Sequence, residues 1–330
     1  MSQRIPIRFA GTGSYMPEQV VDNSHFAGYL DTSDEWIRTR TGIRERRRSA
    51  DDEPTSVLAR KAAERALEDA EMDAAEIDLI ICATATPDFL FPSTASIVQG
   101  EIGATNAGAF DVSAACAGFM HAAAIASGLI SAGVNQTVLV LGCERLTRFV
   151  DMEDRATAVI FGDGAGAAIL TKSHNPEQSV LYCNLGCDGT RTRDIWLPAG
   201  GSRYPANETT VAERLHYMKM RGRDVYKFAV HKIQEEIDAA LVSAGLTAAD
   251  LKLVIPHQSN LRIIESAREK LGLPIEQFAV NIDRYGNTSA ASVPVALDEA
   301  RRSGRLKTGD HVLMIALGAG LTWGTMIIQL

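Results

Sequence analysis

The chain has 330 residues, of which 46% are hydrophobic and 22% are charged, so it buries a large core and is not intrinsically disordered. Its formal net charge of -8 disfavours nucleic acid as a partner, and no run approaches the roughly 20 apolar residues that cross a membrane. Because the N-terminus also lacks the apolar core of a signal peptide, the sequence predicts a cytoplasmic protein.

The first conspicuous segment is basic. Residues 38–48 are rich in arginine, with four arginines close together at residues 44–48. Composition favours a solvated loop, and a cradle for a phosphorylated cofactor is the alternative.

The five cysteines are odd in number, widely scattered and without metal-type companions. This pattern disfavours both a disulfide framework and a zinc site, so we expect reduced thiols and no bound metal. The cysteines are Cys82, Cys116, Cys143, Cys183 and Cys187.

An internal repeat organises the chain. Residues 67–84 align without a gap with residues 241–258, at an offset of 174, and each segment is typical of a helix, a short turn and an apolar strand. Residues 116–133 align next with residues 287–304, at an offset of 171. Two copies of one unit predict a duplicated α/β architecture of mostly parallel sheets covered by helices.

A polar stretch with a proline, residues 172–179, separates the two copies. Such a stretch between apolar segments is typical of a boundary. The predicted halves are therefore residues 1–174 and 175–330.

Cys116 follows a predicted strand and stands at the start of an apolar helix, among small residues that leave room for a ligand. A helix N-terminus lowers the pKa of a nearby thiol through the dipole and the free N–H groups, which favours a nucleophile. Most cysteines are inert small hydrophobes, and that alternative stays open.

Two further residues are candidates for the same site. His257 follows an apolar strand in a His-Gln-Ser-Asn cluster, at the strand end where open α/β sheets collect their ligand sites. Asn287, taken alone, is typical of a helix cap after Gly286. The repeat aligns Asn287 with Cys116, so we expect the three residues to converge.

Residues 161–168 and 317–324 are rich in glycine. Neither segment has the G-x-G-x-x-G spacing after a strand with an acidic residue downstream, which argues against a nicotinamide cofactor. Glycine at these places favours tight packing or the backbone N–H groups of an oxyanion hole.

The ordered motifs together resemble the β-ketoacyl-ACP synthase III family of the thiolase superfamily, over essentially the whole chain. The family implies a homodimer with a thiolase-like fold, in which duplicated βαβαβαββ halves form a five-layered αβαβα arrangement. The motifs are TSDEWIRTRTGIRER (residues 32–46), TPDFLFPSTA (86–95), DVSAACAGF (111–119), FGDGAGA (161–167), PHQSNLRI (256–263), GNTSAAS (286–292) and GLTWG (320–324).

The resemblance also implies an activity. Cys116 would take the acyl group of an acyl-CoA, and His257 and Asn287 would bind the malonyl-ACP thioester carbonyl during decarboxylative Claisen condensation to 3-ketoacyl-ACP. This reaction initiates fatty-acid chains with acyl-CoA and malonyl-acyl carrier protein as substrates and no separate cofactor. The elongating synthases resemble Cys-His-His enzymes instead, so initiation is favoured.

The same resemblance assigns further residues. The implied residues are Trp36, Arg40, Arg155 and Asn260 for CoA; the N–H groups of Cys116 and Ala319 for the oxyanion hole; Phe91, reaching across the dimer, and Leu317 for the acyl pocket; and Lys227, Arg262 and Lys270 for the carrier protein. Two alternatives stay open: Trp36 as plain core packing, and Phe91 as a simple interface residue.

Four features depart from the family pattern. Ser259 replaces an alanine, and Ala319 interrupts a triple glycine. Leu317 replaces a phenylalanine that helps to desolvate the malonyl carboxylate, which weakens the expectation of efficient decarboxylation. Residues 201–217 are longer than a minimal member needs, and are read as a lid or a surface insertion.

Three other functions compete with this reading. Leu317 favours a related acyl-CoA-dependent acyltransferase or ketosynthase of specialised metabolism. A cysteine hydrolase fits the three residues but not the repeat. A non-catalytic acyl-CoA-binding protein is disfavoured because all three candidate residues are present.

Overall fold

Two sheets come from separate parts of the chain. The computed structural model describes residues 4–175 and 177–330. One sheet has the strand order β1-β7-β6-β4-β5, and the other has the order β11-β12-β13-β8. The strands are β1 (Ile7–Tyr15), β4 (Leu79–Ala83), β5 (Gly108–Val112), β6 (Thr137–Arg145) and β7 (Asp163–Lys172), then β8 (Ser179–Cys187), β11 (Leu251–Pro256), β12 (His311–Gly318) and β13 (Thr322–Gln329).

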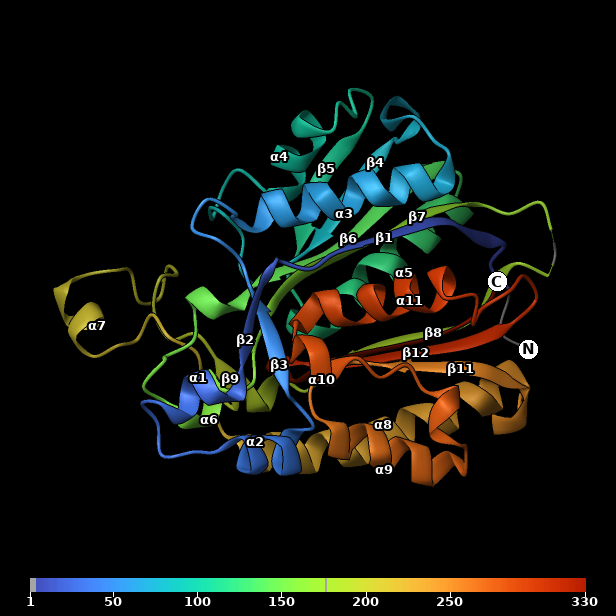
Figure 1. The fold of residues 1–330 in the computed structure, drawn as a ribbon. Helices are drawn as coiled ribbons and strands as arrows, with labels where there is room; N and C mark the ends of the chain where they lie inside the picture. The colour runs from blue at the N-terminus through green and yellow to red at the C-terminus, as the bar shows by residue number, and fades with distance from the viewer. Residues whose placement is uncertain (1–3, 176) are drawn as a thin grey trace.

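Helices cover both sheets, so that five layers alternate (Figure 1). Two helices of the first half lie outside the first sheet, two helices of the second half lie outside the second sheet, and one helix from each half fills the space between the sheets. This confirms the predicted αβαβα arrangement. The helices outside the first sheet are α3 (Thr55–Ala70) and α4 (Thr94–Glu101), and those outside the second sheet are α8 (Gly222–Ala244) and α9 (Leu261–Leu271). The two helices between the sheets are α5 (Gly118–Ser131) and α11 (Ser292–Arg302).

The sheets are mixed, not mostly parallel as the repeat suggested. In the first sheet β4 is parallel to β5 and to β6, whereas β7 runs antiparallel to both β6 and β1. In the second sheet only the β11–β12 pair is parallel. The last two strands of each half follow each other without a covering helix, and such a connection returns the chain in the opposite direction.

The second half lacks a full counterpart of β5. A single β-bridge between Val254 and Phe278 stands in its place. The amide of Gln258 bonds the O of Ala279, at 3.0 Å, and the N–H of Asn281, at 3.0 Å. A side chain therefore takes the backbone groups that a longer strand would pair.

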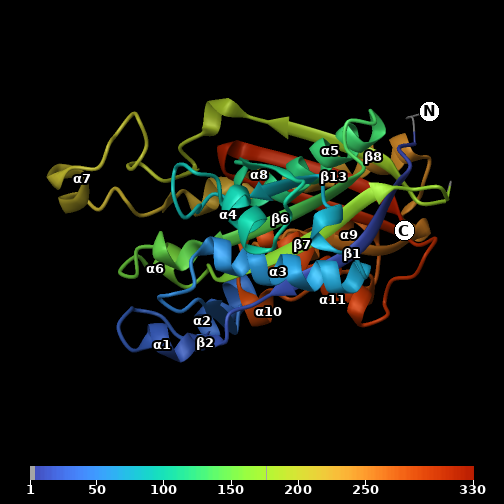
Figure 2. The same cartoon turned by 90° about the horizontal axis from the view of Figure 1, so that it is seen from above.

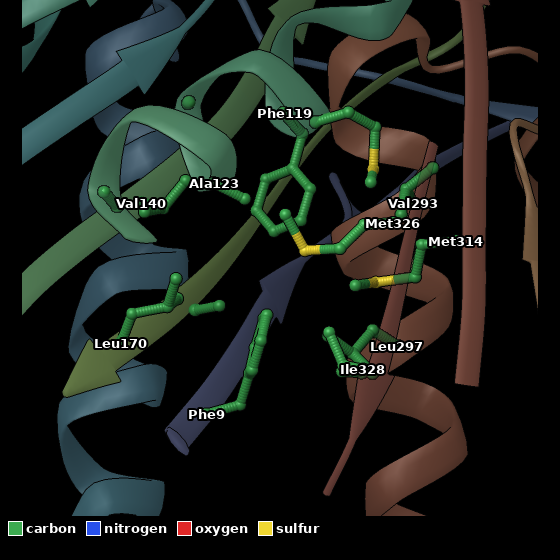
Figure 3. Close-up of a cluster of buried hydrophobic side chains, with 14 of the residues drawn as sticks. Phe9, Phe119, Ala123, Val140, Leu170, Val293, Leu297, Met314, Met326 and Ile328 are labelled. Atoms are coloured by element: carbon green, nitrogen blue, oxygen red, sulfur yellow. The ribbon is translucent and has the colours of Figure 1, made fainter. Parts of the chain in front are cut away.

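The central layer holds a continuous apolar core. Figure 3 shows Phe119 of α5 with Met326 of β13 close to its ring, and Val293 and Leu297 of α11 nearby. All four side chains are buried. Full burial of one such side chain contributes about 1.5–3 kcal/mol, so this layer anchors α5 and α11 between the two sheets.

The structure changes the register of the repeat. The short 3-10 turns that precede α5 and α11, η2 (Ala115–Ala117) and η7 (Ser289–Ala291), start at residues 174 apart, as do β6 and β12. Their first residues share a left-handed backbone, with φ of 46° at Ala115 and 49° at Ser289. Cys116 is therefore equivalent to Ala290, and the predicted equivalence with Asn287 is wrong by three residues.

The basic run is not a solvated loop throughout. It forms the end of α2 (Asp34–Thr41) and β3 (Glu45–Arg48), which pairs with β2 (Gln19–Asp22). Arg46 is buried, donates to the O of Val21 and of Val159, and lies 4.6 Å over the Phe26 ring. Burial lowers the pKa of Arg46 to about 10, so this guanidinium keeps its charge at neutral pH.

Residues 201–217 form an excursion that projects from the body (Figure 2). It carries the short helix α7 (Glu208–Ala212) and connects β9 (Ile195–Trp196) to β10 (Lys219–Met220). The Nε of Arg214 donates to Asp151 at 3.0 Å, which ties the base of the excursion to the first half. In the described residues, no helix is long and apolar enough to span a membrane.

Candidate active site

Cys116 lies in η2, the tight turn between β5 and α5. The end of β12 packs directly against this turn: a Cβ on Gly318 would lie 2.7 Å from the Cys116 N and 2.8 Å from the Ala114 O. The Thr322 hydroxyl donates to the same Ala114 O at 2.9 Å. Glycine at 318 is therefore required by the close approach, and the second half holds the nucleophile of the first half in place.

The prediction that the helix terminus lowers the pKa of Cys116 is wrong for this resting state. Burial raises the pKa of the thiol to about 12, a hydrogen bond with Ser289 lowers it, and the charge of Glu144 raises it further. Desolvation is the largest cause of the raised pKa, because burial disfavours the charged thiolate. The thiol is protonated at neutral pH, so it needs a proton acceptor when it reacts.

His257 follows β11 and is buried. Its N–H donates to the Ile315 O at 2.7 Å, and its Nδ1 lies 2.6 Å from the Ser292 Oγ at the start of α11. Burial lowers the pKa of His257 to about 3, so the ring is neutral at physiological pH. When the Ser292 hydroxyl donates to Nδ1, the proton of the neutral ring is on Nε2, and Nε2 is then a hydrogen-bond donor.

The neighbouring Gln258 is fully bonded. Its Nε2 donates to the Pro256 O and the Ala279 O, and its Oε1 accepts from the N–H groups of Asn281 and Ile282. This side chain joins the His257 loop to the segment that leads to Asn287. Sequence reasoning grouped it with the polar cluster but did not identify this role.

Asn287 is held between the two halves. Its N–H donates to the Ile160 O at 2.9 Å, its O accepts from the Gly162 N–H at 3.0 Å, and its Oδ1 accepts from the Ser289 N–H at 2.8 Å. Because Oδ1 is already occupied, the amide nitrogen of Asn287 is the group left for a ligand. A Cβ on Gly162 would lie 2.4 Å from the Tyr285 O, which explains the first glycine of the segment 161–168.

One largely apolar cavity of about 400 Å³ collects the predicted catalytic residues. The lining comes from the nucleophile turn, from the paired strands β9 and β10, and from α2. Among the predicted site residues, its lining includes Cys116, His257, Asn287, Leu317, Ala319, Trp36 and Asn260.

The predicted CoA residues gather at α2. The guanidinium carbons of Arg40 and Arg155 lie 4.6 Å and 4.8 Å from the Trp36 ring centroid. Arg155 also donates to the Asp31 O, at 2.5 Å. Asn260 caps α9 and donates to the Arg40 O at 3.1 Å, so its side chain already has structural partners.

The remaining predicted residues do not line this cavity. Phe91 is 87% exposed, at the tip of an apolar loop. Lys227 lies in the second turn of α8 and Arg262 in the first turn of α9, both beside cavity-lining residues, whereas Lys270 pairs with Asp238 at 2.9 Å. Asp238 lies eleven residues along α8 from Lys227, or about 16 Å, so the three basic residues do not form one compact patch.

The most informative residue that sequence reasoning missed is Glu144, at the end of β6. Its side chain is fully buried beneath the cavity wall and bonds Thr86 and Ser289, both of which line the cavity. The sequence does contain a signal for Glu144, which stands between Cys143 and Arg145 near the end of an apolar strand. A carboxylate in such a buried strand is rare unless it has a partner or a function. Among the described residues, no cluster of His, Cys, Asp or Glu could hold a metal ion.

Comparisons with known proteins agree with this geometry. The family models for the C-terminal and N-terminal parts of 3-oxoacyl-[acyl-carrier-protein] synthase III match residues 241–330 and 110–189. The β-ketoacyl-[acyl-carrier-protein] synthase III of Clostridioides difficile is 50% identical over 97% of each chain.

Solved structures give the same result. The crystal structure of 3-oxoacyl-[acyl-carrier-protein] synthase III from Aquifex aeolicus is 43% identical, with a TM-score of 0.91 over 98% of this chain and 100% of that one. The priming β-ketosynthase of the R1128 polyketide pathway is 39% identical, with a TM-score of 0.91 over 100% of this chain and 98% of that one. With relatives this similar over nearly their whole length, the chain belongs to the β-ketoacyl-ACP synthase III family.

Proposed function

We propose that this enzyme is an acyltransferase that loads an acyl group from acyl-CoA onto Cys116. It then condenses that group with malonyl-ACP, with loss of carbon dioxide, and so starts a fatty-acid chain as 3-ketoacyl-ACP. The observation that carries the proposal is the convergence of Cys116, His257 and Asn287 on one apolar cavity that extends to Trp36. The names of the curated relatives support the same reaction.

In the loading step the Cys116 sulfur attacks the thioester carbonyl of acyl-CoA. A covalent acyl-enzyme divides a difficult transfer between two thioesters into two easier steps. The backbone N–H groups of Cys116 and Ala319 are the proposed donors to the oxyanion, since Gly318 packs against the nucleophile turn and brings Ala319 to the cavity.

In the condensation step His257 and Asn287 donate to the carbonyl oxygen of the malonyl thioester. A neutral imidazole with its proton on Nε2 and an amide whose Oδ1 is occupied both present N–H groups, which stabilise the enolate that forms as carbon dioxide leaves. Leu317 adds an apolar wall to the cavity, which disfavours the charged carboxylate of the malonyl group.

A homodimer is part of the proposal. The loop tip exposes three apolar side chains, with Phe89, Leu90 and Phe91 at 59%, 80% and 87%. A continuous exposed apolar tip is typical of a surface that a partner covers. Phe91 would then close the acyl pocket of the partner subunit.

The carrier protein would dock where Lys227 and Arg262 flank the cavity. Acidic partners are steered by such local basic groups even when the whole protein is acidic. Lys270 contributes less in this arrangement, because Asp238 already neutralises it. These partners and CoA thioesters favour a cytoplasmic location.

A ketosynthase of specialised metabolism is the second candidate. The 39% identity with the priming β-ketosynthase of a polyketide pathway favours it. That candidate shares the loading step and the cysteine, and differs in the acyl group that the cavity accepts.

Replacing Trp36 by alanine is expected to raise KM for acyl-CoA about 5-fold to 150-fold, since stacking of a base such as the CoA adenine on an aromatic side chain contributes about 1–3 kcal/mol. The turnover number of loading should change little, because Trp36 would contact the CoA and not the reacting thioester. Steady-state loading assays check this, with Trp36→Phe as the matched control that keeps a ring against Arg40 and Arg155. An unchanged KM would assign Trp36 to core packing.

The proposed function is tested by incubating the purified protein with acetyl-CoA and with longer acyl-CoAs, then adding malonyl-ACP. We expect a mass increase of one acyl group on Cys116, seen by intact-protein and peptide mass spectrometry, followed by 3-ketoacyl-ACP and carbon dioxide. Loading without condensation would favour an acyltransferase that uses another acceptor. Absence of loading by every acyl-CoA would refute the proposal.

A further inference from the structure

Glu144 is a buried carboxylate that the proposed reaction does not yet use. It lies at the C-terminal end of β6, where the loop after β4 meets η7 of the second half. Its side chain is fully buried, and no cation is among its bonded partners in the described residues. A carboxylate in such a place is costly unless several donors stabilise it.

The donors around Glu144 come from both halves. Thr86 donates to Oε2 at 2.6 Å, the Ala85 N–H lies 3.2 Å from both oxygens, and Ser289 donates to Oε1 at 3.0 Å. Despite these bonds, burial raises the pKa of Glu144 to about 7. The group therefore exchanges a proton near physiological pH.

Ser289 links this carboxylate to the nucleophile. The hydroxyl that donates to Glu144 belongs to η7, which packs against the η2 turn of Cys116, and both residues line the cavity. This hydroxyl also lowers the pKa of the Cys116 thiol. Its left-handed backbone, with φ of 49°, and the bond from its N–H to the Asn287 Oδ1 hold it in this position. Ser289 thus lies between the turn that carries the reacting sulfur and the buried carboxylate of Glu144.

His257 does not offer an equivalent acceptor. Its Nδ1 is bonded to Ser292, and its low pKa, about 3, makes the neutral ring a poor base. The charge of Glu144 raises the pKa of three thiols: Cys116 from η2, Cys82 from β4 and Cys143 from β6. The thiols of Cys82 and Cys143 bond each other at 3.2 Å, and burial raises the pKa of Cys143.

We propose that Glu144 is the proton acceptor for Cys116, reached through the hydroxyl of Ser289, and that it stores this proton for as long as the cysteine is acylated. Glu144 acts through Ser289 and does not touch the substrate. The loading part of this inference rests on the proposed function, whereas the proton path from the thiol does not.

The proton balance closes over one cycle. As the sulfur bonds to the acyl carbon, its proton moves to Ser289 and the serine proton moves to Glu144; the CoA thiolate leaves and takes a proton from solvent. In condensation the enolate carbon bonds to the acyl carbon, and the C–S bond to Cys116 breaks. Glu144 then returns its proton through Ser289 to the departing thiolate, and the resting state is restored.

Glu144→Gln separates this role from simple electrostatics. The charge of Glu144 raises the pKa of the Cys116 thiol, so its removal should make Cys116 more reactive if the carboxylate acts only as a charge. A proton acceptor predicts the opposite, a Cys116 that reacts roughly 10²-fold to 10⁴-fold more slowly at pH 7.5. The two hypotheses thus differ in sign.

The experiment measures alkylation of Cys116 by iodoacetamide between pH 5.5 and 9 in the full-length protein, by peptide mass spectrometry. Cys116 gains the acetamide group, iodide leaves, and the proton goes to Glu144. The exposed Cys187 in the same digest serves as the internal reference. The wild-type rate should rise with pH through about 7, as Glu144 ionises, and then level off.

Ser289→Ala is the second variant, because Glu144→Gln places a donor amide among the groups that donate to Glu144 and could unfold the protein. Ser289→Ala should abolish the rise near pH 7 and move it to higher pH, where the thiol ionises by itself. A faster reaction of Cys116 in Glu144→Gln, or a rise near pH 7 that persists in Ser289→Ala, would overturn the proposal. Alkylation needs no acyl-CoA, so its result stands whether or not the proposed function holds.

Discussion

Replacing Cys116 by alanine is expected to abolish the acyl-enzyme and to reduce formation of 3-ketoacyl-ACP by roughly 10³-fold or more. The proposed mechanism has no second nucleophile in the cavity: Cys82 and Cys143 are buried in the sheet, and Ser289 is bonded to Glu144. Intact-protein mass spectrometry after incubation with acyl-CoA, together with a product assay, measures both effects.

The same variant should keep a separate partial reaction. His257 and Asn287 are held by Ser292, Ile160 and Gly162, and none of these bonds involves the Cys116 side chain. Slow decarboxylation of malonyl-ACP is therefore expected to continue without condensation. Cys183→Ala is the matched control, because this exposed cysteine lies on β8, and it should load acyl groups as the wild type does. Loading of the Cys116→Ala protein at another residue would contradict the mechanism.

The sequence predicted the layers of the fold because each layer has a local signature. Apolar strands alternate with helices whose apolar faces cover a sheet, and the helix–turn–strand segments 67–84 and 241–258 repeat with a fixed spacing. The same signature did not set the register before α5 and α11. Both helices follow short runs of small residues, mainly alanine and serine, which align almost equally well at several offsets.

The candidate site was predictable where chemistry is concentrated in motifs. Cys116, His257 and Asn287 were identified from motifs, and the structure brings them to one cavity although the repeat argument for Asn287 used the wrong register. Glu144 was not predicted, because its meaning depends on Thr86 and Ser289, which lie far from it in the sequence. The raised pKa of Cys116 was also beyond the sequence, since it arises from burial between the two halves.

Replacing His257 by alanine is expected to slow condensation by roughly 10²-fold to 10³-fold, because one donor to the developing enolate contributes about 2.7–4 kcal/mol to lowering the barrier. Loading of Cys116 from acyl-CoA should change only a few-fold. The reason is the low pKa of His257, about 3: between pH 6 and 8 the ring is neutral and gains charge only in strong acid, so it is a donor and a poor base.

Stopped-flow loading and a carbon dioxide assay with pre-loaded enzyme separate the two steps. His257→Gln, which restores an N–H donor, should recover part of the condensation rate, whereas a base cannot be replaced by an amide. Ser292→Ala should also slow condensation more than loading. Without the Ser292 hydroxyl as a donor to Nδ1, the ring proton is free to move from Nε2 to Nδ1, and Nε2 then no longer donates to the enolate. If His257→Ala instead slowed loading as much as condensation, the histidine would be the base for Cys116, as in cysteine hydrolases, and Glu144 would have no proton to store.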